Sequence, residues 1–178
     1  REDITRITKT SIKAFSSIAE SRNVKITTHI PDQEVMVFCS VDAVDSILSN
    51  LLSNAVKYCT SSFDVSVEEK GDVVSVRVSS DGNRIPDKES ERIFEAFYQS
   101  KEIDSQGAGI GLTYSRSLAN LQNSRLYLDT KVKDRNSFVL ELPKTYEVSK
   151  EDADTKAIEA VLSAKDRPCI LVVEDNPS

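Results

Sequence analysis

Apolar residues recur at helical spacing in two long segments near the start of the chain. Residues 4–21 present an apolar stripe that ends before Arg22-Asn23, a pair that suits a helix C-terminus. Residues 41–58 present a broader apolar face, and Ser40 precedes them as a capping residue. The apolar positions of this second segment are Val44, Ile47, Leu48, Leu51, Leu52 and Ala55. The pattern predicts two amphipathic helices.

Alternating apolar and polar residues predict strands in six further segments. These are residues 24–30, 34–38, 62–69, 73–79, 125–130 and 137–142. Lys70-Gly71-Asp72 separates the third and fourth of them as a hairpin turn. A short helix is predicted near residues 87–94, and another from the glycines at 107–111 to about Leu121. Helices and strands thus alternate within one α/β domain.

The composition excludes several classes of protein. The 178 residues include 23 Lys and Arg against 29 Asp and Glu, a net charge of −6, so we do not expect direct binding to nucleic acid. No apolar run reaches the roughly 18–20 residues that span a bilayer, and no secretory segment opens the chain. The three cysteines form neither a disulfide framework nor a metal-binding pair. We therefore expect a cytoplasmic protein.

The character of the sequence changes after Pro143. Residues 146–167 are highly charged and predict an exposed helical linker, whereas residues 168–173 have the apolar run of a buried strand. We therefore predict a domain at residues 1–145, a linker at 146–167 and the first strand of a further domain at 168–178.

Glycine is scarce and concentrated. Of the five glycines, Gly107, Gly109 and Gly111 lie within one five-residue stretch that precedes a predicted helix. Glycines before a helix let phosphate approach the free N–H groups of its first turn. A dinucleotide-binding turn would need G-x-G-x-x-G directly after a strand, and a phosphate-binding Walker loop would need G-K-[ST]; neither is present. The alternative for this stretch is a flexible loop that ends in a helix.

Polar residues on the second helix add a second signal. Asn50, Asn54 and Lys57 fall on one arc beside its apolar face. An amide oxygen is a hard neutral ligand for Mg²⁺, and a lysine neutralises phosphate. On its own this arc is typical of a solvated helix face, but together with the glycines it favours a site for a magnesium–triphosphate.

Four segments resemble, in the right order, the motifs of the ATP-binding domain of sensor histidine kinases. Residues 50–58 (NLLSNAVKY) resemble the N box, and residues 78–86 (VSSDGNRIP) resemble the G1 box. Residues 92–98 (RIFEAFY) are similar to the F box, and residues 107–112 (GAGIGL) to the G2 box. The F box points to a histidine kinase rather than to another branch of the GHKL superfamily.

The resemblance implies a fold, a cofactor and a set of site residues. The fold is α/β, a two-layer sandwich with helices on one face of a mixed sheet, and the ligand is ATP with Mg²⁺. Asn50, Asn54 and Lys57 would act at the phosphates, with Asn54 as the Mg²⁺ ligand. The segment from Tyr98 to Gln106 would form a lid. The other nucleotide-binding residues implied are Tyr58, Ser80, Asp81, Gly82, Ile85, Phe94, Phe97, Lys101, Gly107, Ala108, Gly109, Ile110, Gly111 and Leu112.

The G1 segment departs from the family pattern, which usually reads Asp-x-Gly-x-Gly-Ile. Ser80 stands where the family has the Asp that accepts from the adenine amino group, and Arg84 stands at the second glycine. Such a bond to a carboxylate is worth about 1.5–3 kcal/mol, so its loss weakens ATP binding. Asp81 is a candidate replacement, and Arg84 either narrows the pocket or adds a cation near the phosphates. Asn123-Ser124 also replaces the glycines expected after the G2 helix.

The last residues carry a second resemblance. Residues 170–177 (ILVVEDNP) look like the first strand of a response-regulator receiver domain. This resemblance implies a hybrid histidine kinase as the parent, with a receiver domain as a partner. The sequence leaves open whether that parent is anchored in the inner membrane. The parent is expected to be a homodimer and this chain a monomer.

The one histidine of the sequence does not resemble the phosphoacceptor of a histidine kinase. His29 lies in an alternating strand without the sequence context of a phosphoacceptor. The resemblance therefore implies transfer of the γ-phosphoryl of ATP to a histidine on dimerisation helices outside this chain, and the isolated chain is expected to be inactive in autophosphorylation. Two alternatives stay open: a degenerate nucleotide-binding or docking module, and a dinucleotide-dependent oxidoreductase.

Overall fold

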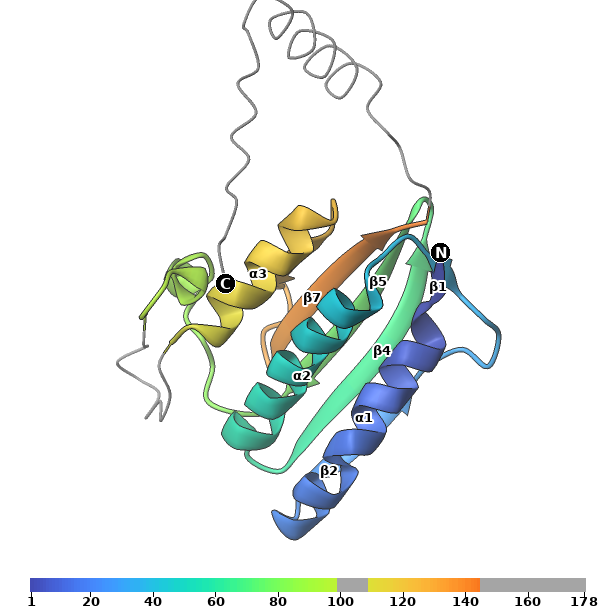
Figure 1. The fold of residues 1–178 in the computed structure, drawn as a ribbon. Helices are drawn as coiled ribbons and strands as arrows, with labels where there is room; N and C mark the ends of the chain where they lie inside the picture. Colours follow the sequence, from blue (N-terminus) through green and yellow to red (C-terminus); the bar gives the residue numbers. More distant parts are fainter. Residues whose placement is uncertain (99–108, 145–178) are drawn as a thin grey trace, which may run out of the picture. The chain divides into compact units, whose positions relative to one another are not determined.

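Three α-helices lie over one face of a five-stranded sheet in residues 1–98 and 109–144, which are the residues that the computed structural model describes (Figure 1). These residues belong to the unit that spans Arg1–Thr145. The helices are α1 (Ile4–Ser21), α2 (Val41–Tyr58) and α3 (Gly111–Leu121). The strands of the sheet are β2 (Lys25–His29), β4 (Ser62–Lys70), β5 (Val73–Ser80), β6 (Arg125–Leu128) and β7 (Asn136–Pro143).

The sheet is mixed and has the strand order β2-β4-β5-β7-β6. β2 pairs parallel with β4, because the chain crosses over through α2 between them, and the other three pairs are antiparallel. β4 and β5 form the expected hairpin, whose turn contains Gly71 at φ +59°. Helices on one face of a mixed sheet make the predicted two-layer α/β sandwich, which is confirmed.

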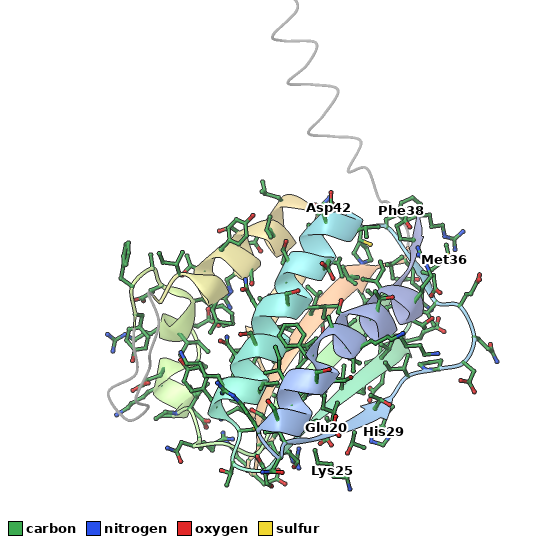
Figure 2. All side chains as sticks on the ribbon, turned by 60° about the horizontal axis from the view of Figure 1, so that its bottom comes forward. Glu20, Lys25, His29, Met36, Phe38 and Asp42 are labelled. Carbon is green, nitrogen blue, oxygen red and sulfur yellow. The ribbon has the colours of Figure 1, made fainter. Side chains whose placement is uncertain are left out.

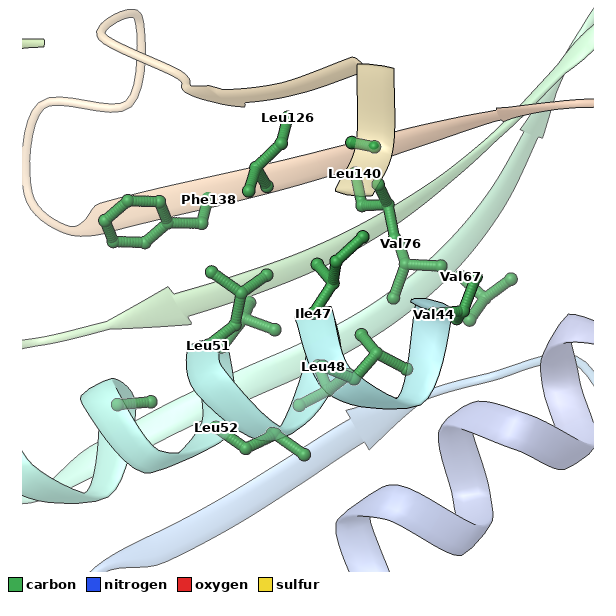
Figure 3. Close-up of a cluster of buried hydrophobic side chains, with 14 of the residues drawn as sticks. Val44, Ile47, Leu48, Leu51, Leu52, Val67, Val76, Leu126, Phe138 and Leu140 are labelled. Atoms are coloured by element: carbon green, nitrogen blue, oxygen red, sulfur yellow. The ribbon is translucent and has the colours of Figure 1, made fainter. Parts of the chain in front are cut away.

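The core lies between the sheet and α2. Alternate residues of β4, Phe63, Val65 and Val67, point toward the helices and are buried. The apolar face of α2 packs onto them and onto β5 and β7, and Figure 3 shows its side chains meeting Val76, Phe138 and Leu140. Each fully buried Leu, Ile or Val contributes about 1.5–3 kcal/mol. The same packing fixes the direction in which the polar arc of α2 faces.

α1 and α2 begin at side-chain caps, and α1 and α3 end in left-handed turns. Asp3 caps α1 by accepting from the Thr5 N–H, and Ser40 caps α2 by accepting from the Ala43 N–H. Two residues after the last residue of α1 and of α3 stands an asparagine with φ +55°, Asn23 and Asn123 respectively. At each end the next residue donates its N–H to the carbonyl five residues earlier, Ala19 in α1 and Ala119 in α3. Asn123 thus adopts the conformation for which glycine was expected.

The structure corrects the prediction for residues 87–94. The segment forms two separate 3-10 turns, η1 (Asp87–Glu89) and η2 (Arg92–Phe94), rather than one short helix. Its N–H groups bond to carbonyls three residues back, as in Glu89 to Pro86 and Phe94 to Glu91. Such tight turns are usual where a short segment must follow tertiary contacts instead of continuing a helix.

Three predicted strands are shorter in the structure, and the first of them, residues 24–30, loses one residue at each end. Residues 34–38 keep only β3 (Met36–Val37), which pairs with an unexpected strand, β1 (Glu2–Asp3). Val35 does not belong to β3. Its N–H donates to the Asp3 carboxylate, and its carbonyl accepts from the Ile4 N–H, so neither group pairs in a strand ladder. β6 ends at Leu128 because Asp129 accepts from the Lys131 N–H and turns the chain.

His29 lies on the edge strand β2, where it is exposed (Figure 2). The interpretation of His29 as a strand-surface residue is confirmed. Within residues 1–98 and 109–144, no helix combines the length and the apolar character needed to cross a membrane. The predicted linker and the receiver-like strand lie outside the described residues.

Candidate functional site

α2 and α3 are joined by the first asparagine of the polar arc. The Asn50 Nδ2 donates to the Ser115 hydroxyl at 2.9 Å and to the Gly111 carbonyl at 3.3 Å. Asn50 therefore fixes the polar arc of α2 beside the first turn of the helix that the glycines precede. The structure brings together two of the predicted motifs, and it does so through a side chain that the sequence had placed at the phosphates.

Asn54 lies one helical turn after Asn50 and is half-buried. Among the described residues its side chain makes no hydrogen bond, so its amide oxygen is available to a ligand. No group of three or more His, Cys, Asp or Glu that could hold a metal ion occurs in this part of the chain. Asn54 therefore fits Mg²⁺ only as one ligand among phosphate oxygens and waters, which is how Mg²⁺ is commonly held.

The end of α2 carries a cation and an aromatic ring. The Lys57 Nζ lies 4.9 Å from the centre of the Tyr58 ring. Lys57 is also in the last turn of α2, where a positive charge is favourable. The carbonyl of Tyr58 meets the G1 turn closely, since a Cβ built on Gly82 would stand 2.0 Å from that oxygen. Gly82 is thus required for the turn to lie against the end of α2.

Ser80 is the last residue of β5 and lies in register with Phe63 and Asn136. Ser80 is buried and points to the helix-covered face, because alternate residues of a strand face the same side and Val76 and Val78 face the helices. The position that the resemblance gives to the adenine-binding Asp is therefore on the correct side of the sheet, but it carries a hydroxyl.

Asp81 anchors the loop between α2 and β4. Its carboxylate accepts from the N–H groups of Thr60, Ser61 and Ser62 and from the Ser61 hydroxyl at 2.6 Å. Partial burial alone would raise the pKa of Asp81, but these hydrogen bonds outweigh it and hold the pKa well below its usual value. Both oxygens are thus engaged, which counts against Asp81 as the replacement contact for adenine.

The Arg84 side chain turns to the loop between β6 and β7. Its guanidinium donates to the carbonyls of Thr130, Val132 and Arg135 and to the Asp87 carboxylate. The guanidinium therefore pairs with Asp87, which it shares with Lys133, and its other donors are directed at carbonyls of the β6–β7 loop. Arg84 also lies outside the left-handed backbone region, so an arginine fits where glycine was expected.

The F box divides into a buried and an exposed part. Phe94 packs in the core, edge-on to Phe138 and beneath the Arg116 guanidinium at 3.7 Å. Phe97 is 74% exposed and has a φ of +63°, which is rare for an aromatic residue. Arg92 lies over the ring of Tyr98 at 4.7 Å. Phe94 thus anchors the segment while Phe97 stands at the surface.

Residues on either side of the predicted lid, Phe97 and Gly109, meet. The Phe97 N–H donates to the Gly109 carbonyl at 3.1 Å, and a Cβ on Gly109 would stand 2.9 Å from the Tyr98 carbonyl oxygen. Gly109 has φ +66°, so glycine is required there for both reasons. Ile110 precedes α3 and supplies no side-chain cap, which leaves the first-turn N–H groups for a ligand. Leu112 is half-buried against the core.

Lys101, Gly107 and Ala108 lie outside the described residues. Ile85 is buried in the G1 turn, where its N–H donates to the Asn136 Oδ1 at 2.8 Å. Asn136 and Arg116 were not among the site residues predicted from the sequence. The sequence does carry a sign of Asn136. Asn136, Phe138 and Leu140 are alternate residues on the helix-facing side of β7, and Asn136 is the polar one among them.

Three comparisons with known proteins place the chain. Residues 39–146 match the model of the histidine kinase-, DNA gyrase B-, and HSP90-like ATPase family. The sensor histidine kinase WalK of Bacillus subtilis is 25% identical over 142 residues, which are 76% of this chain and 23% of WalK. The sensor protein CreC of Escherichia coli is 33% identical over 122 residues, which are 64% of this chain and 26% of CreC. The chain thus spans only a minor part of these relatives.

Solved structures agree on the fold. A nucleotide-free catalytic domain of the histidine kinase ThkA matches with a TM-score of 0.71 at 20% identity, over 80% of this chain and 95% of that one. Full-length ShkA in complex with AMPPNP matches with a TM-score of 0.70 at 22% identity, over 80% of this chain and 30% of that one. The chain belongs to the histidine kinase-, DNA gyrase B- and HSP90-like ATPase family, and its fold is shared with catalytic domains of histidine kinases.

Proposed function

We propose that this domain binds Mg·ATP between α2 and the start of α3 and serves as the phosphoryl donor module of a sensor histidine kinase. The observation that supports it most is the pair of Asn50 bonds, which hold the polar arc of α2 against the uncapped first turn of α3. Anions are stabilised at such helix N-termini. The relatives WalK and ThkA are named as histidine kinases, and ShkA was solved with AMPPNP.

The residues divide the work at the triphosphate. Asn54 would hold Mg²⁺ through its amide oxygen, and bound Mg²⁺ supplies charge neutralisation at the phosphate oxygens. Lys57 adds positive charge on the same side, and the first-turn N–H groups of α3 donate to the phosphate oxygens. Positioning and charge neutralisation are the main contributions that a protein makes to phosphoryl transfer.

The acceptor is a histidine outside these residues. In the transfer, an imidazole nitrogen forms a bond to the γ-phosphorus as the bond to the β-phosphate oxygen breaks, leaving ADP. His29, the only histidine of the chain, is exposed on the edge strand β2. The acceptor is therefore assigned to dimerisation helices of the same parent, and the isolated chain is expected to bind ATP without phosphorylating itself. ThkA has been solved in complex with the response regulator protein TrrA, and we assign this domain a receiver as a downstream partner on the same basis.

The experiment is an assay with radiolabelled ATP on the full 178-residue chain, alone and mixed with a histidine-bearing dimerisation domain from its parent. The proposal expects label on the dimerisation domain only. Label on neither protein, with nucleotide binding intact, contradicts donor activity. Label on this chain alone contradicts the assignment of the acceptor.

A second candidate function is favoured by the G1 turn. Ser80 carries no carboxylate, and that of Asp81 is engaged with Thr60, Ser61 and Ser62. A docking module with weak nucleotide binding would tolerate this loss. Ser80→Asp separates the two, because a large gain in ATP affinity favours the degenerate module, whereas little change indicates that the site binds the base by other contacts.

A further inference from the structure

The G1 turn is fastened to the β6–β7 loop by the residue that replaces a family glycine. The Arg84 NH1 donates to the Val132 carbonyl at 2.5 Å, and its NH2 donates to the Asp87 Oδ1 at 2.7 Å. Asp87 in turn accepts from the Lys133 Nζ at 2.8 Å. One guanidinium thus connects the G1 turn, the start of η1 and the loop at residues 130–135.

A second fastening comes from the start of β7. The Asn136 Oδ1 accepts from the Ile85 N–H at 2.8 Å, and the Asn136 Nδ2 donates to the Asn83 carbonyl at 2.7 Å. Asn136 is only 7% exposed, so both halves of its amide are satisfied by the G1 backbone rather than by water. The two hydrogen bonds hold Asn83 and Ile85, the residues on either side of Arg84.

The remaining end of the turn is fixed from the opposite side. Asp81 is tied to the α2–β4 loop, and Gly82 lies against the Tyr58 carbonyl. Without Arg84 and Asn136, residues 83–86 would be held through the burial of Ile85 and through the bond that the Pro86 carbonyl accepts from the Glu89 N–H. An irregular segment with few fastenings samples many conformations, and a ligand that needs one of them binds more weakly.

We infer that Arg84 and Asn136 are positioning residues for nucleotide binding: they clasp the G1 turn to the β6–β7 loop and hold it in the conformation that receives the nucleotide. The inference rests on the proposed function, because it assigns the clasp to that same site. It differs from the two roles that the sequence offered Arg84, because it assigns the guanidinium to contacts with the β6–β7 loop and Asp87 rather than to the ligand.

The test uses Arg84→Ala in the full chain, with two readouts taken at a temperature where every variant is folded. Calorimetric titration gives the dissociation constant of Mg·ATP, and amide hydrogen exchange without nucleotide reports the Ile85 N–H. We expect Arg84→Ala to raise the dissociation constant about three- to tenfold, as for the loss of charge-assisted hydrogen bonds, and to speed exchange at Ile85. Arg84→Lys keeps the charge but not the fork of donors, so its dissociation constant and its exchange rate at Ile85 should lie between those of the native chain and Arg84→Ala.

A matched control and a second variant keep the inference open to contradiction. Arg125→Ala removes an arginine that is 77% exposed on β6 and should change neither readout. Asn136→Ser breaks both backbone bonds and should repeat the effect of Arg84→Ala if the variant folds.

Four outcomes of Arg84→Ala would overturn the inference. Faster exchange with an unchanged dissociation constant would make the clasp purely structural. Weaker binding with unchanged exchange would make Arg84 a direct ligand contact. Tighter binding would show that Arg84 obstructs the nucleotide. No change in either readout would show that Arg84 does not position the G1 turn. If the unaltered chain binds no ATP, the proposed function fails instead, and exchange at Ile85 still decides whether the clasp exists.

Discussion

Gly82 and Gly71 differ in what a side chain would meet. A Cβ on Gly82 collides with the Tyr58 carbonyl at 2.0 Å, whereas a Cβ on Gly71 meets nothing within 4 Å and is disfavoured only by its φ of +59°. We expect Gly82→Ala to destabilise the fold by about 3 kcal/mol, because backbone must move, and to weaken Mg·ATP binding. Gly71→Ala should cost about 1 kcal/mol and leave binding unchanged.

Urea denaturation and calorimetric titration of the two alanine variants check this prediction. Equal losses of stability would show that the approach of the G1 turn to α2 can relax at little cost. Unchanged ATP binding in a folded Gly82→Ala would separate that turn from the nucleotide site.

Asp81 makes the stability of the domain depend on pH. Its pKa in the folded state lies below the 3.8 of the unfolded chain, so the stabilisation is fully present above that value. It is lost as the pH falls through the folded-state pKa, because the unfolded chain then binds the proton more readily. We therefore expect the difference in unfolding free energy between the native chain and Asp81→Asn to be constant near neutral pH and to shrink below about pH 4.

Urea unfolding at a series of pH values from neutral downward measures this difference. Asp134→Asn, a change at an exposed position in the β6–β7 loop, is the control and should show no such trend. A difference that stays constant into acid, or that grows, contradicts the loop-anchoring role of Asp81.

The sequence could predict which residue types stand at the site but not which bonds they already make. Asn50, Asn54 and Lys57 were identified because helical spacing is regular. The partners of Asp81 come from a loop some twenty residues away, and the carbonyl partners of Arg84 come from a loop nearly fifty residues away. Such long-range contacts leave no local pattern, so the roles suggested for these two residues were open alternatives.

α3 and the η2 turn are connected through Arg116. Its guanidinium stacks on Phe94 at 3.7 Å, its Nε donates to the Leu126 carbonyl, and its NH1 bonds to Glu91 at 2.8 Å. The charge of Arg116 lowers the pKa of Glu91 through this bond. We expect Arg116→Ala to cost about 1–2 kcal/mol and to speed amide exchange in residues 92–98.

Arg6→Ala is the matched control on α1, because the Arg6 side chain is 69% exposed and, among the described residues, its ion pair is with Glu2 of β1. It should change stability by less than about 0.5 kcal/mol. Exchange in residues 92–98 that is the same in both variants would show that Arg116 does not hold the F box.

The end of α3 offers a stabilising change. Asn123 has φ +55°, a conformation that glycine adopts more easily than asparagine. We expect Asn123→Gly to stabilise the domain by about 0.5 kcal/mol in thermal unfolding. Asn120→Gly, inside the last turn of the same helix, should destabilise it. Destabilisation by both changes would mean that the Asn123 side chain, rather than its backbone, supports the turn.

Elements with strong periodicity were predicted nearly to the residue. α2 follows its predicted range, and the ends of α1, β4 and β5 lie within about one residue of theirs. Residues 34–38 and 87–94 were less well predicted. There the backbone bonds to Asp3, Ile4 and neighbouring turns instead of completing a regular element, and no periodic signal records such partners.

At the scale of the folded unit, the sheet and its helix layer bring the G1 turn, the polar arc of α2 and the start of α3 together within the described residues. β5 ends at the G1 turn, α2 presents its polar arc, and α3 begins beside that arc. The order of motifs predicted this arrangement through resemblance, since pairing of β5 with β7 cannot be derived from local pattern alone. The clasp between the G1 turn and the β6–β7 loop follows from the same pairing.

The central claim is that the face between α2 and α3 binds Mg·ATP, and a titration of the full chain followed by amide NMR tests it most directly. We predict saturable binding at millimolar nucleotide or below, with shifts at the amides of Gly82, Gly109 and Gly111. Asn54→Ala should weaken Mg²⁺-dependent binding about tenfold or more, as loss of a metal ligand does, while the exposed Asn120→Ala binds as the native chain does. A folded chain that shows no saturable shifts at these glycines, or an Asn54→Ala variant that binds Mg·ATP normally, would contradict the claim.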